Sequence, residues 1–463
     1  MHRRQWLQLP AAALLGATAR AARGQAAPAD GDPAIDRLLA ARVRVQGVGL
    51  VGAVVDVDRV RVGAAGTRRA GTDLVPTADT LVEYGSITKT FTALLLADAV
   101  LRRELALADP VEAVLPDGLT LRDRAGSPLT WADLATHRSG LPRLPGNLRD
   151  PTGADPYDYS RTELWTFVRG WKPERARDEQ WAYSNLGYGL LAEALALRAG
   201  RSYAALLDER VLRPLGLAGM SLALRDGPVA GLLPGHDASG RPVPNWRFDA
   251  LAGAGALVGS VRALARYAQA ALGLFDHPLR EAFRLALTPR AEGPSAHNPV
   301  GLAWLFGPLN GRRVANHDGA TGGFSTSLFL DPERRRAALV LAHAQVGIND
   351  LALHLLDPAV PLRDLSAEQR QRERAAASVP AEQLRPLAGS YALNAQLRIH
   401  VRERDGRLFA QATGQGEFEL FAIDARRFFA RVAALEMHFD GDRGVPASLR
   451  LHQAGQTLRF VRE

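Results

Sequence analysis

The chain has 463 residues, of which 47% are apolar, and this is enough for two or three domains with sizeable cores. Its net charge of +8 comes from arginines scattered among 49 acidic residues, and no basic stripe interleaved with aromatic residues is present, which argues against nucleic-acid binding. Cysteine is absent, which excludes disulfides, thiolate nucleophiles and the common structural zinc sites, and we expect no metal and no cofactor.

The N-terminal residues 1–27 are similar to an export signal. Arg3-Arg4 precedes a short apolar run at 9–19, and small residues follow it, a pattern typical of twin-arginine signals. An arginine-rich start of a cytosolic chain is the competing interpretation. No other segment has the roughly 18 uninterrupted apolar residues of a membrane span, so the mature chain is expected to have none and to be periplasmic or secreted.

The first ordered elements predicted are a strand pair and a helix. Residues 47–66 alternate small and β-branched residues, which indicates two strands. From Ser86 the apolar residues follow a helical period, so Ser86 and Lys89 would share one face of a first helical turn. Only two of the 57 Lys and Arg residues are lysine, and lysine, unlike arginine, loses its proton when it is desolvated.

The centre of the chain is predicted to be helical and its continuation to return to strands. Loops rich in Pro and Gly separate the helix-like stretches, and no alternating βαβ rhythm is present. An early strand pair, a long helical insertion and a late strand pair predict an α+β domain whose sheet is assembled from both ends. The helix-like stretches are 187–199, 202–212, 261–273 and 348–356, and the late strands are 325–331 and 337–343.

Beyond residue 365 the pattern changes again. Residues 366–382 are charged and then alanine-rich, which suits a helical linker. Residues 383–463 have alternating runs and an Asp405-Gly406 hairpin signal, which indicate a small β-sandwich or barrel. We therefore predict an α+β domain over 28–365 followed by the linker and this β domain.

Three short motifs carry the candidate chemistry. Ser86 becomes a nucleophile if a base takes its proton, and Lys89 supplies one if burial and neighbouring dipoles lower its pKa. The alternative is that Ser86 caps the helix and Lys89 is solvated. Tyr183 and Asn185 lie two residues apart, and a phenol that relays protons beside an amide suits acyl transfer. Residues 317–320 are expected to enter a strand after a turn, where glycine allows close approach of a substrate.

The order of the three motifs resembles the serine β-lactamase and penicillin-binding superfamily, specifically its class C-like branch of peptidases, esterases and lactamases. The motifs are Ser-Ile-Thr-Lys at 86–89, Tyr-Ser-Asn at 183–185 and His-Asp-Gly at 317–319, and the stretches 130–142 and 211–220 are also similar. The resemblance covers about residues 35 to 345. It implies a β-lactamase/transpeptidase-like domain, with an antiparallel sheet flanked by helices and an all-helical region.

The resemblance also implies catalytic roles. Ser86 is expected to be the nucleophile and Lys89 its base. Tyr183 is expected to pass a proton to the leaving group and later to help activate water. The backbone amides of Ser86 and Ala320 would form the oxyanion hole.

Substrate recognition is expected to involve Asn185, His317 and Gly319. His317 stands where β-lactamases of this class usually carry the lysine of a Lys-Thr-Gly triplet, and a neutral imidazole attracts a carboxylate less than an ammonium does. Asp318 would add a negative charge if it pointed into the pocket. This departure favours the peptidases and esterases of the family over its dedicated lactamases.

The sequence therefore predicts an exported serine hydrolase that cleaves a small-molecule ester, amide or D-amino-acid peptide through an acyl-enzyme on Ser86. A true β-lactamase is the alternative, and a catalytically silent scaffold that uses the β domain as an interaction surface is a second one. His137 is expected to be part of a structural turn, His236 to lie in a loop bordering the cleft, and Lys172 to be solvated.

Overall fold

The computed structural model describes most of the chain. The predicted export signal and the first part of the predicted linker lie outside the described residues. None of the helices that are described is long and apolar enough to cross a membrane. The described ranges are 31–69, 72–148, 157–217, 219–365, 374–394, 397–413, 417–453 and 456–463.

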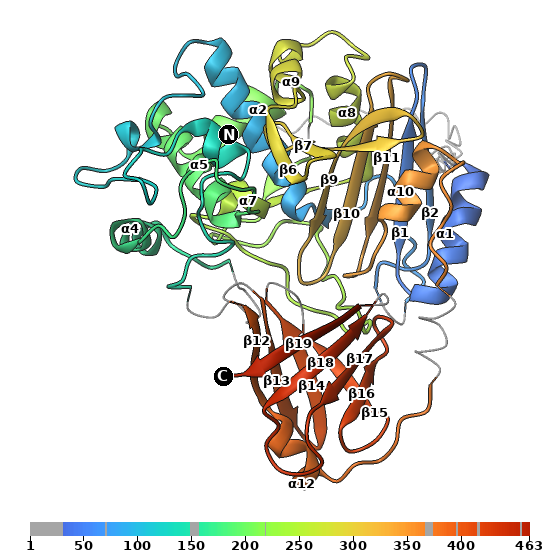
Figure 1. The fold of residues 1–463 in the computed structure, drawn as a ribbon. Helices are drawn as coiled ribbons and strands as arrows, with labels where there is room; N and C mark the ends of the chain where they lie inside the picture. Colours follow the sequence, from blue (N-terminus) through green and yellow to red (C-terminus); the bar gives the residue numbers. More distant parts are fainter. Residues whose placement is uncertain are drawn as a thin grey trace, which may run out of the picture.

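An eight-stranded antiparallel sheet forms the centre of the first domain (Figure 1). Its order is β2-β1-β11-β10-β9-β8-β7-β6, so the early hairpin pairs with the last strand, as predicted for a sheet assembled from both ends. Its strands are β1 (Leu50–Val55), β2 (Val60–Ala65), β6 (Ala291–Ser295), β7 (Asn298–Val300), β8 (Leu305–Leu309), β9 (Arg312–Ala320), β10 (Ser325–Asp331) and β11 (Arg336–Ala342).

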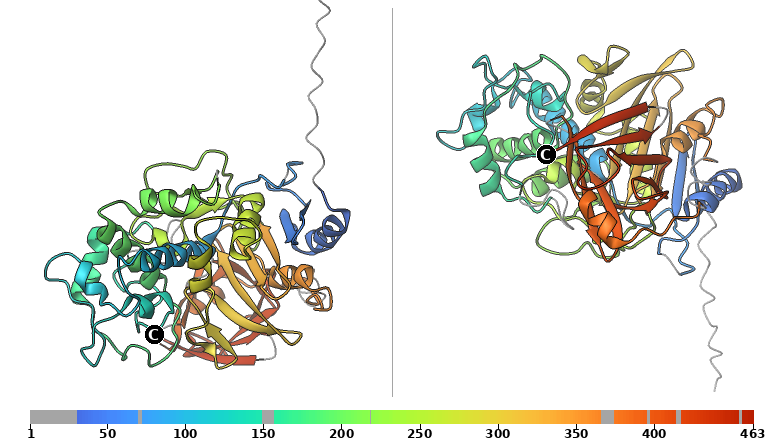
Figure 2. Two further views of the ribbon diagram at one scale, coloured as in Figure 1. Left: turned by 90° about the horizontal axis from the view of Figure 1, so that it is seen from above. Right: turned by 60° about the horizontal axis from the view of Figure 1, so that its bottom comes forward.

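Both faces of this sheet are covered by helices (Figure 2). Strand β1 is buried along its whole length. Because successive side chains alternate across a strand, Val51 and Ala53 belong to the core on the helical side, whereas Leu50 and Val54 belong to the core on the other side. The first face packs against α8 (Val261–Ala271), and the second packs against α1 (Pro33–Gln46) and α10 (Asn349–Leu356).

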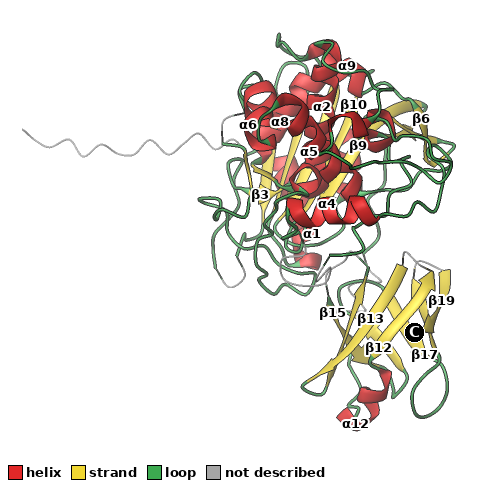
Figure 3. Ribbon diagram, turned by 90° about the vertical axis from the view of Figure 1, so that its left-hand side faces the viewer, coloured by secondary structure: helices red, strands yellow, loops and turns green. Residues whose placement is uncertain are grey.

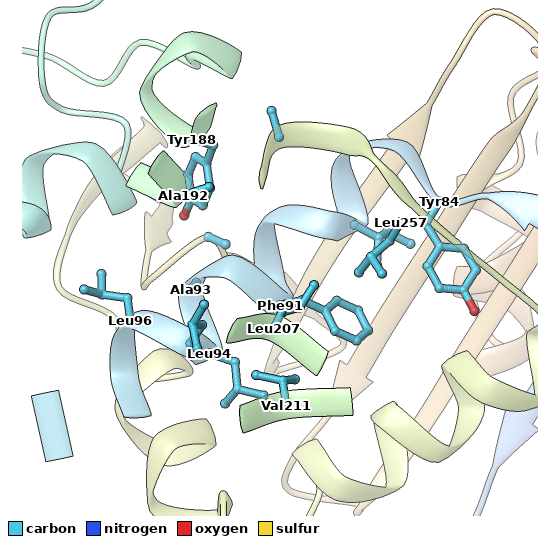
Figure 4. Close-up of a cluster of buried hydrophobic side chains, with 14 of the residues drawn as sticks. Tyr84, Phe91, Ala93, Leu94, Leu96, Tyr188, Ala192, Leu207, Val211 and Leu257 are labelled. Atoms are coloured by element: carbon cyan, nitrogen blue, oxygen red, sulfur yellow. The ribbon is translucent and has the colours of Figure 1, made fainter. Parts of the chain in front are cut away.

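Helix α2 (Thr88–Leu101) is the central element of the helical side. Residues 88–99 are all buried, so the helix has no solvated face, and Phe91 and Leu94 pack among side chains of several other elements (Figure 4). Around it lie α3 (Trp131–Ala135), α4 (Arg161–Gly170), α5 (Asn185–Ala199), α6 (Tyr203–Leu207), α7 (Ala252–Gly255), α9 (Arg280–Ala286), the short helices η2 (Val111–Val114) and η3 (Asp208–Leu212), and the small sheet of β3 (Val82–Glu83), β4 (Ser221–Leu222) and β5 (Leu257–Gly259).

The third motif is placed differently from the sequence prediction. Residues 317–320 end strand β9 rather than begin a strand, because β9 starts at Arg312 and pairs with β8 through a tight hairpin. The hairpin turns at Asn310 and Gly311, whose φ values of 47° and 80° are both positive, as a type I′ turn requires. The motif therefore lies one strand length beyond the turn.

The C-terminal β domain is a closed eight-stranded barrel rather than a sandwich, and it lies below the first domain in Figures 1 and 3. Asp405 and Gly406 form the predicted hairpin turn, with φ values of 52° and 71°. The guanidinium of Arg241 in the first domain lies 5.9 Å from the ring centroid of Phe409 in the barrel. Helices α12 (Ala381–Leu384) and η4 (Arg385–Leu387) precede β12 (Gly389–Asn394), β13 (Leu397–Arg404), β14 (Arg407–Ala412), β15 (Phe418–Ala422), β16 (Arg427–Ala430), β17 (Leu435–Phe439), β18 (Ser448–Gln453) and β19 (Gln456–Arg462).

Candidate active site

Ser86 lies at the junction between a short 3-10 helix, η1 (Gly85–Ile87), and α2. The N-cap of α2 is Ile87 and no side chain caps the helix, so the alternative that Ser86 serves as a helix cap is wrong. Its Oγ instead lies 3.0 Å from Nζ of Lys89, and its side chain is only partly buried. The hydroxyl is therefore accessible and paired with the one basic group of this turn.

Lys89 is completely buried, which rules out the solvated alternative. Its Nζ contacts three oxygen atoms, Oγ of Ser86 at 3.0 Å, Oδ1 of Asn185 at 2.8 Å and the carbonyl oxygen of Ala254 at 2.7 Å. Burial lowers the pKa of Lys89 well below its usual 10.5, and the positive charge of Arg143 lowers the pKa further. A lowered pKa keeps the amine of Lys89 neutral over a wider pH range, and a general base must be neutral to accept a proton.

Tyr183 lies one residue before Ser184, the N-cap of α5. Its phenol hydrogen-bonds with Ser86, and Nζ of Lys89 is 4.9 Å from its ring centroid. Burial raises the pKa of Tyr183 above its usual value, more than the hydrogen bond to Ser86 lowers it. The environment therefore moves the pKa values of Lys89 and Tyr183 in opposite directions.

Asn185 is buried, and both polar atoms of its amide have protein partners. Its Oδ1 accepts from Lys89, and its Nδ2 donates to the hydroxyl of Tyr157 at 2.8 Å. Burial raises the pKa of Tyr157 to about 12, so this phenol stays protonated. Tyr157 was missed in the sequence, because a lone tyrosine in a loop carries no spacing signal.

The end of β9 approaches Ser86 closely. A Cβ on Gly319 would lie 2.0 Å from the carbonyl oxygen of Tyr84 and 2.9 Å from the amide nitrogen of Ser86. Gly85 has a φ of 52°, and a Cβ there would lie 2.8 Å from the amide nitrogen of Ala320. The chain thus needs glycine on both sides of the contact that brings the amides of Ser86 and Ala320 together.

His317 lies beside Tyr183, with ring centroids 6.3 Å apart, and is 2% exposed. Its Nδ1 lies 2.7 Å from the carbonyl oxygen of Asp318, and its Nε2 has no hydrogen-bond partner among the described residues. Burial, together with the charge of Lys89, lowers the pKa of His317 to about 4, so the imidazole is neutral near pH 7. The carboxylate of Asp318 is exposed and accepts a hydrogen bond from Asn349 at the start of α10.

Two further histidines and the second lysine occupy different surroundings. His137 is buried and stacks on Tyr183 with ring centroids 4.4 Å apart, and its Nδ1 accepts from the amide of Ser184, so the predicted structural turn supports the active site. His236 is buried, with Nδ1 2.8 Å from the carbonyl oxygen of His343. Lys172 is exposed, as predicted.

The close approach of β9 to η1 leads to a prediction for Gly319→Ala. The added Cβ would meet backbone atoms that are unable to move aside, so we expect a loss of stability of about 1–3 kcal/mol and, because the amides of Ser86 and Ala320 shift apart, a decrease in kcat/KM of about 100-fold. Gly170→Ala is the control, since nothing lies within 4 Å of its Cβ position. Thermal unfolding and ester hydrolysis of both variants measure the effects, and a Gly319→Ala enzyme with unchanged activity would contradict this geometry.

Comparisons with known proteins agree with the fold. A family model described as Beta-lactamase matches residues 35–356. The D-alanyl-D-alanine-carboxypeptidase/endopeptidase AmpH of Escherichia coli K12 is 28% identical over 331 residues, which cover 66% of this chain and 84% of that protein.

Two solved structures show how far the fold extends. The β-lactamase/D-alanine carboxypeptidase from Yersinia pestis has a TM-score of 0.59 at 23% identity and covers 70% of this chain and 99% of its own. The octameric penicillin-binding protein homologue from Pyrococcus abyssi has a TM-score of 0.61 at 20% identity and covers 92% of this chain and 99% of its own. The fold, the contacts among the three motifs and the family match over well more than half of the sequence together show that this chain is a serine hydrolase of the β-lactamase family.

Proposed function

We propose that the protein forms an acyl-enzyme on Ser86 and hydrolyses a small ester, amide or D-amino-acid peptide. The observation that carries this proposal is the set of partners around Nζ of Lys89. Two of them, Oδ1 of Asn185 and the carbonyl oxygen of Ala254, accept hydrogen bonds but have no hydrogen to donate. When the amine is neutral, its two hydrogens go to these oxygens and its lone pair points to the hydroxyl of Ser86.

The attack then follows from this arrangement. Oγ of Ser86 adds to the substrate carbonyl while its proton passes to Nζ of Lys89. The carbonyl oxygen becomes an oxyanion, and the adjacent backbone amides of Ser86 and Ala320 would stabilise it.

Tyr183 suits the complementary role. Its raised pKa keeps the phenol protonated, so it donates a proton to the leaving group, and the ammonium formed at Lys89 supplies the replacement. In deacylation a water molecule replaces the leaving group, and the same groups work in reverse.

The substrate class follows from His317 and from the relatives. A neutral His317 supplies no permanent positive charge where dedicated lactamases carry lysine, which favours a peptidase or esterase over a β-lactamase. The Escherichia coli relative is named as a D-alanyl-D-alanine carboxypeptidase/endopeptidase, which supports a peptide substrate. Export to the periplasm or medium is part of the proposal and rests on the Arg3-Arg4 segment.

Covalent labelling tests this proposal. We expect the purified protein to take up one fluorophosphonate or β-lactam per chain, with the adduct on the peptide that contains Ser86. A panel of nitrocefin, short-chain nitrophenyl esters and D-Ala-D-Ala peptides then separates the substrate classes, and we expect the esters or peptides to be hydrolysed faster than nitrocefin. No adduct and no turnover would favour a silent scaffold, and fast nitrocefin turnover would favour a true β-lactamase.

A further inference from the structure

The segment that leads into Arg143 is fixed to the second motif by its backbone. The carbonyl oxygen of Arg143 accepts from the amides of Asn185 at 2.9 Å and Leu186 at 3.3 Å. The preceding carbonyl oxygen, that of Pro142, accepts from Oγ of Ser184 at 2.7 Å. These three bonds hold Arg143 beside the start of α5, so its side chain has a defined origin next to the pocket.

The guanidinium of Arg143 lies over the ring of Tyr183, and the residue is exposed. Its central carbon lies 5.1 Å from the ring centroid of Tyr183. Among the described residues its side chain has neither a hydrogen-bond acceptor nor an ion-pair partner, whereas the neighbouring Arg138 is paired with Asp178. A permanent cation therefore stands at the mouth of the site with its hydrogen-bond donors unused.

The other basic groups of the pocket are poorly suited to hold an anion. The positive charge of Arg143 already reaches them, since it lowers the pKa values of Lys89 and His137. Lys89 must be neutral to accept the proton of Ser86, and His317 is neutral near pH 7. Arg143 is thus the group at this site that stays charged throughout the proposed reaction.

The position of Arg143 relative to Tyr183 indicates whether it would contact the acyl part or the leaving group of the substrate. The oxyanion would lie at the amides of Ser86 and Ala320, next to the end of β9. Tyr183 would deliver its proton to the leaving group, and Arg143 lies over the ring of Tyr183. The guanidinium therefore lies next to the group that would protonate the leaving group.

We propose that Arg143 binds a free carboxylate on the leaving group and so makes the enzyme selective for peptides or esters that release an acid-bearing fragment. A guanidinium matches the two oxygens of a carboxylate with two parallel hydrogen bonds. This inference rests on the proposed acyl-enzyme mechanism and assigns its specificity to a residue outside the three motifs.

A matched pair of esters tests the assignment. 3-Acetoxybenzoate and its methyl ester carry the same acyl group and differ in whether the leaving group bears a charge. We expect the wild type to prefer the anionic ester, and Arg143→Gln to lower the ratio of the two kcat/KM values by about 10- to 100-fold, mainly through KM. Arg143→Lys should restore part of the preference, because it restores the charge without the planar fork.

The ratio is chosen because it removes effects that both esters share. Loss of the Arg143 charge also changes the pKa of Lys89, but this change acts equally on two substrates measured with one enzyme at one pH. Arg169→Gln is the control, since Arg169 is an exposed arginine in the last turn of α4 and its replacement changes the net charge equally.

The outcomes separate the two proposals. An unchanged ratio in Arg143→Gln, with both rates lowered together, would overturn the binding role and leave only an effect on Tyr183 or Lys89. A ratio that also falls in Arg169→Gln would assign the preference to the overall charge of the protein. If the wild type hydrolyses neither ester, or if Ser86→Ala hydrolyses both at the wild-type rate, the acyl-enzyme mechanism itself is wrong.

Discussion

Replacing Ser86 by alanine is expected to lower kcat/KM by about 10⁴-fold or more. The loss should be this large because, in the proposed mechanism, Lys89 activates this hydroxyl, which lies 3.0 Å from its Nζ. Neither neighbour offers a substitute nucleophile, since Lys89 is enclosed by three oxygen partners and the phenol of Tyr183 has a raised pKa. Steady-state hydrolysis of a nitrophenyl ester measures the effect.

The matched control for this variant is Ser202→Ala. Ser202 caps α6 by accepting from the amide of Ala205, which is the role that the sequence left open for Ser86. Loss of such a cap costs about 1 kcal/mol of stability, and we expect the activity of this variant to be unchanged. Equal activities of the Ser86→Ala enzyme and the wild type would remove Ser86 from the mechanism, and with it the proposed acyl-enzyme.

The contrast between the two serines shows what the sequence could predict about the site. Ser86 and Lys89 are three residues apart on one helical turn, so their contact follows from local geometry. Tyr183 and Asn185 are similarly close in the chain. The remaining contacts of Lys89 and Asn185, with Ala254 and Tyr157, join segments that are far apart in the chain and leave no periodic signal in the sequence. These contacts depend on how the helices pack, which local sequence patterns do not encode.

The same distinction applies to the fold. The hairpin of β1 and β2, helices α2, α5 and α8 and the pair of β10 and β11 were predicted from their apolar residues. Strands β6 to β8 were missed because each contains a proline, and proline weakens a strand prediction. An Asn310-Gly311 hairpin signal was present and would have placed His317 at the end of its strand. Closure of the barrel depends on the pairing of β12 with β19, which no local pattern encodes.

Arg143 is a residue whose importance could not be derived from spacing. It is one arginine among many, and it lies in a loop without a regular pattern. Its position follows from backbone hydrogen bonds to the start of α5, which link residues about forty positions apart. Lysine is rare in this chain, so Lys89 stands out in the sequence, whereas arginine is common and Arg143 does not.

Lys89 is the subject of the second large expected effect. Replacing it by arginine or methionine should lower kcat/KM by about 10²- to 10⁴-fold, because general-base assistance contributes rate enhancements of this size. Arginine keeps the charge but does not release its proton near neutral pH, and methionine has no basic group. Lys172→Arg changes the other, exposed lysine and is expected to have wild-type activity.

The two variants together separate catalysis from folding. A guanidinium is larger than an ammonium and Lys89 is completely buried, so Lys89→Arg risks unfolding the pocket, whereas methionine fits a buried site of this length. Circular dichroism and thermal unfolding show whether each variant is folded. A folded Lys89→Met enzyme with full activity would exclude Lys89 as the base.

The pH dependence of the wild type gives an independent measure of the same group. The amine must be neutral to accept the proton of Ser86, so kcat/KM should rise with pH through the pKa of Lys89 and reach a plateau above it. Because burial and the charge of Arg143 lower that pKa, the rise should lie well below 10.5. The Arg143→Gln variant lacks the second of these causes, so its kcat/KM should rise at a higher pH than that of the wild type. A rise near 10.5 in the wild type would mean that the ammonium is solvated, in contradiction to its enclosure by Ser86, Asn185 and Ala254.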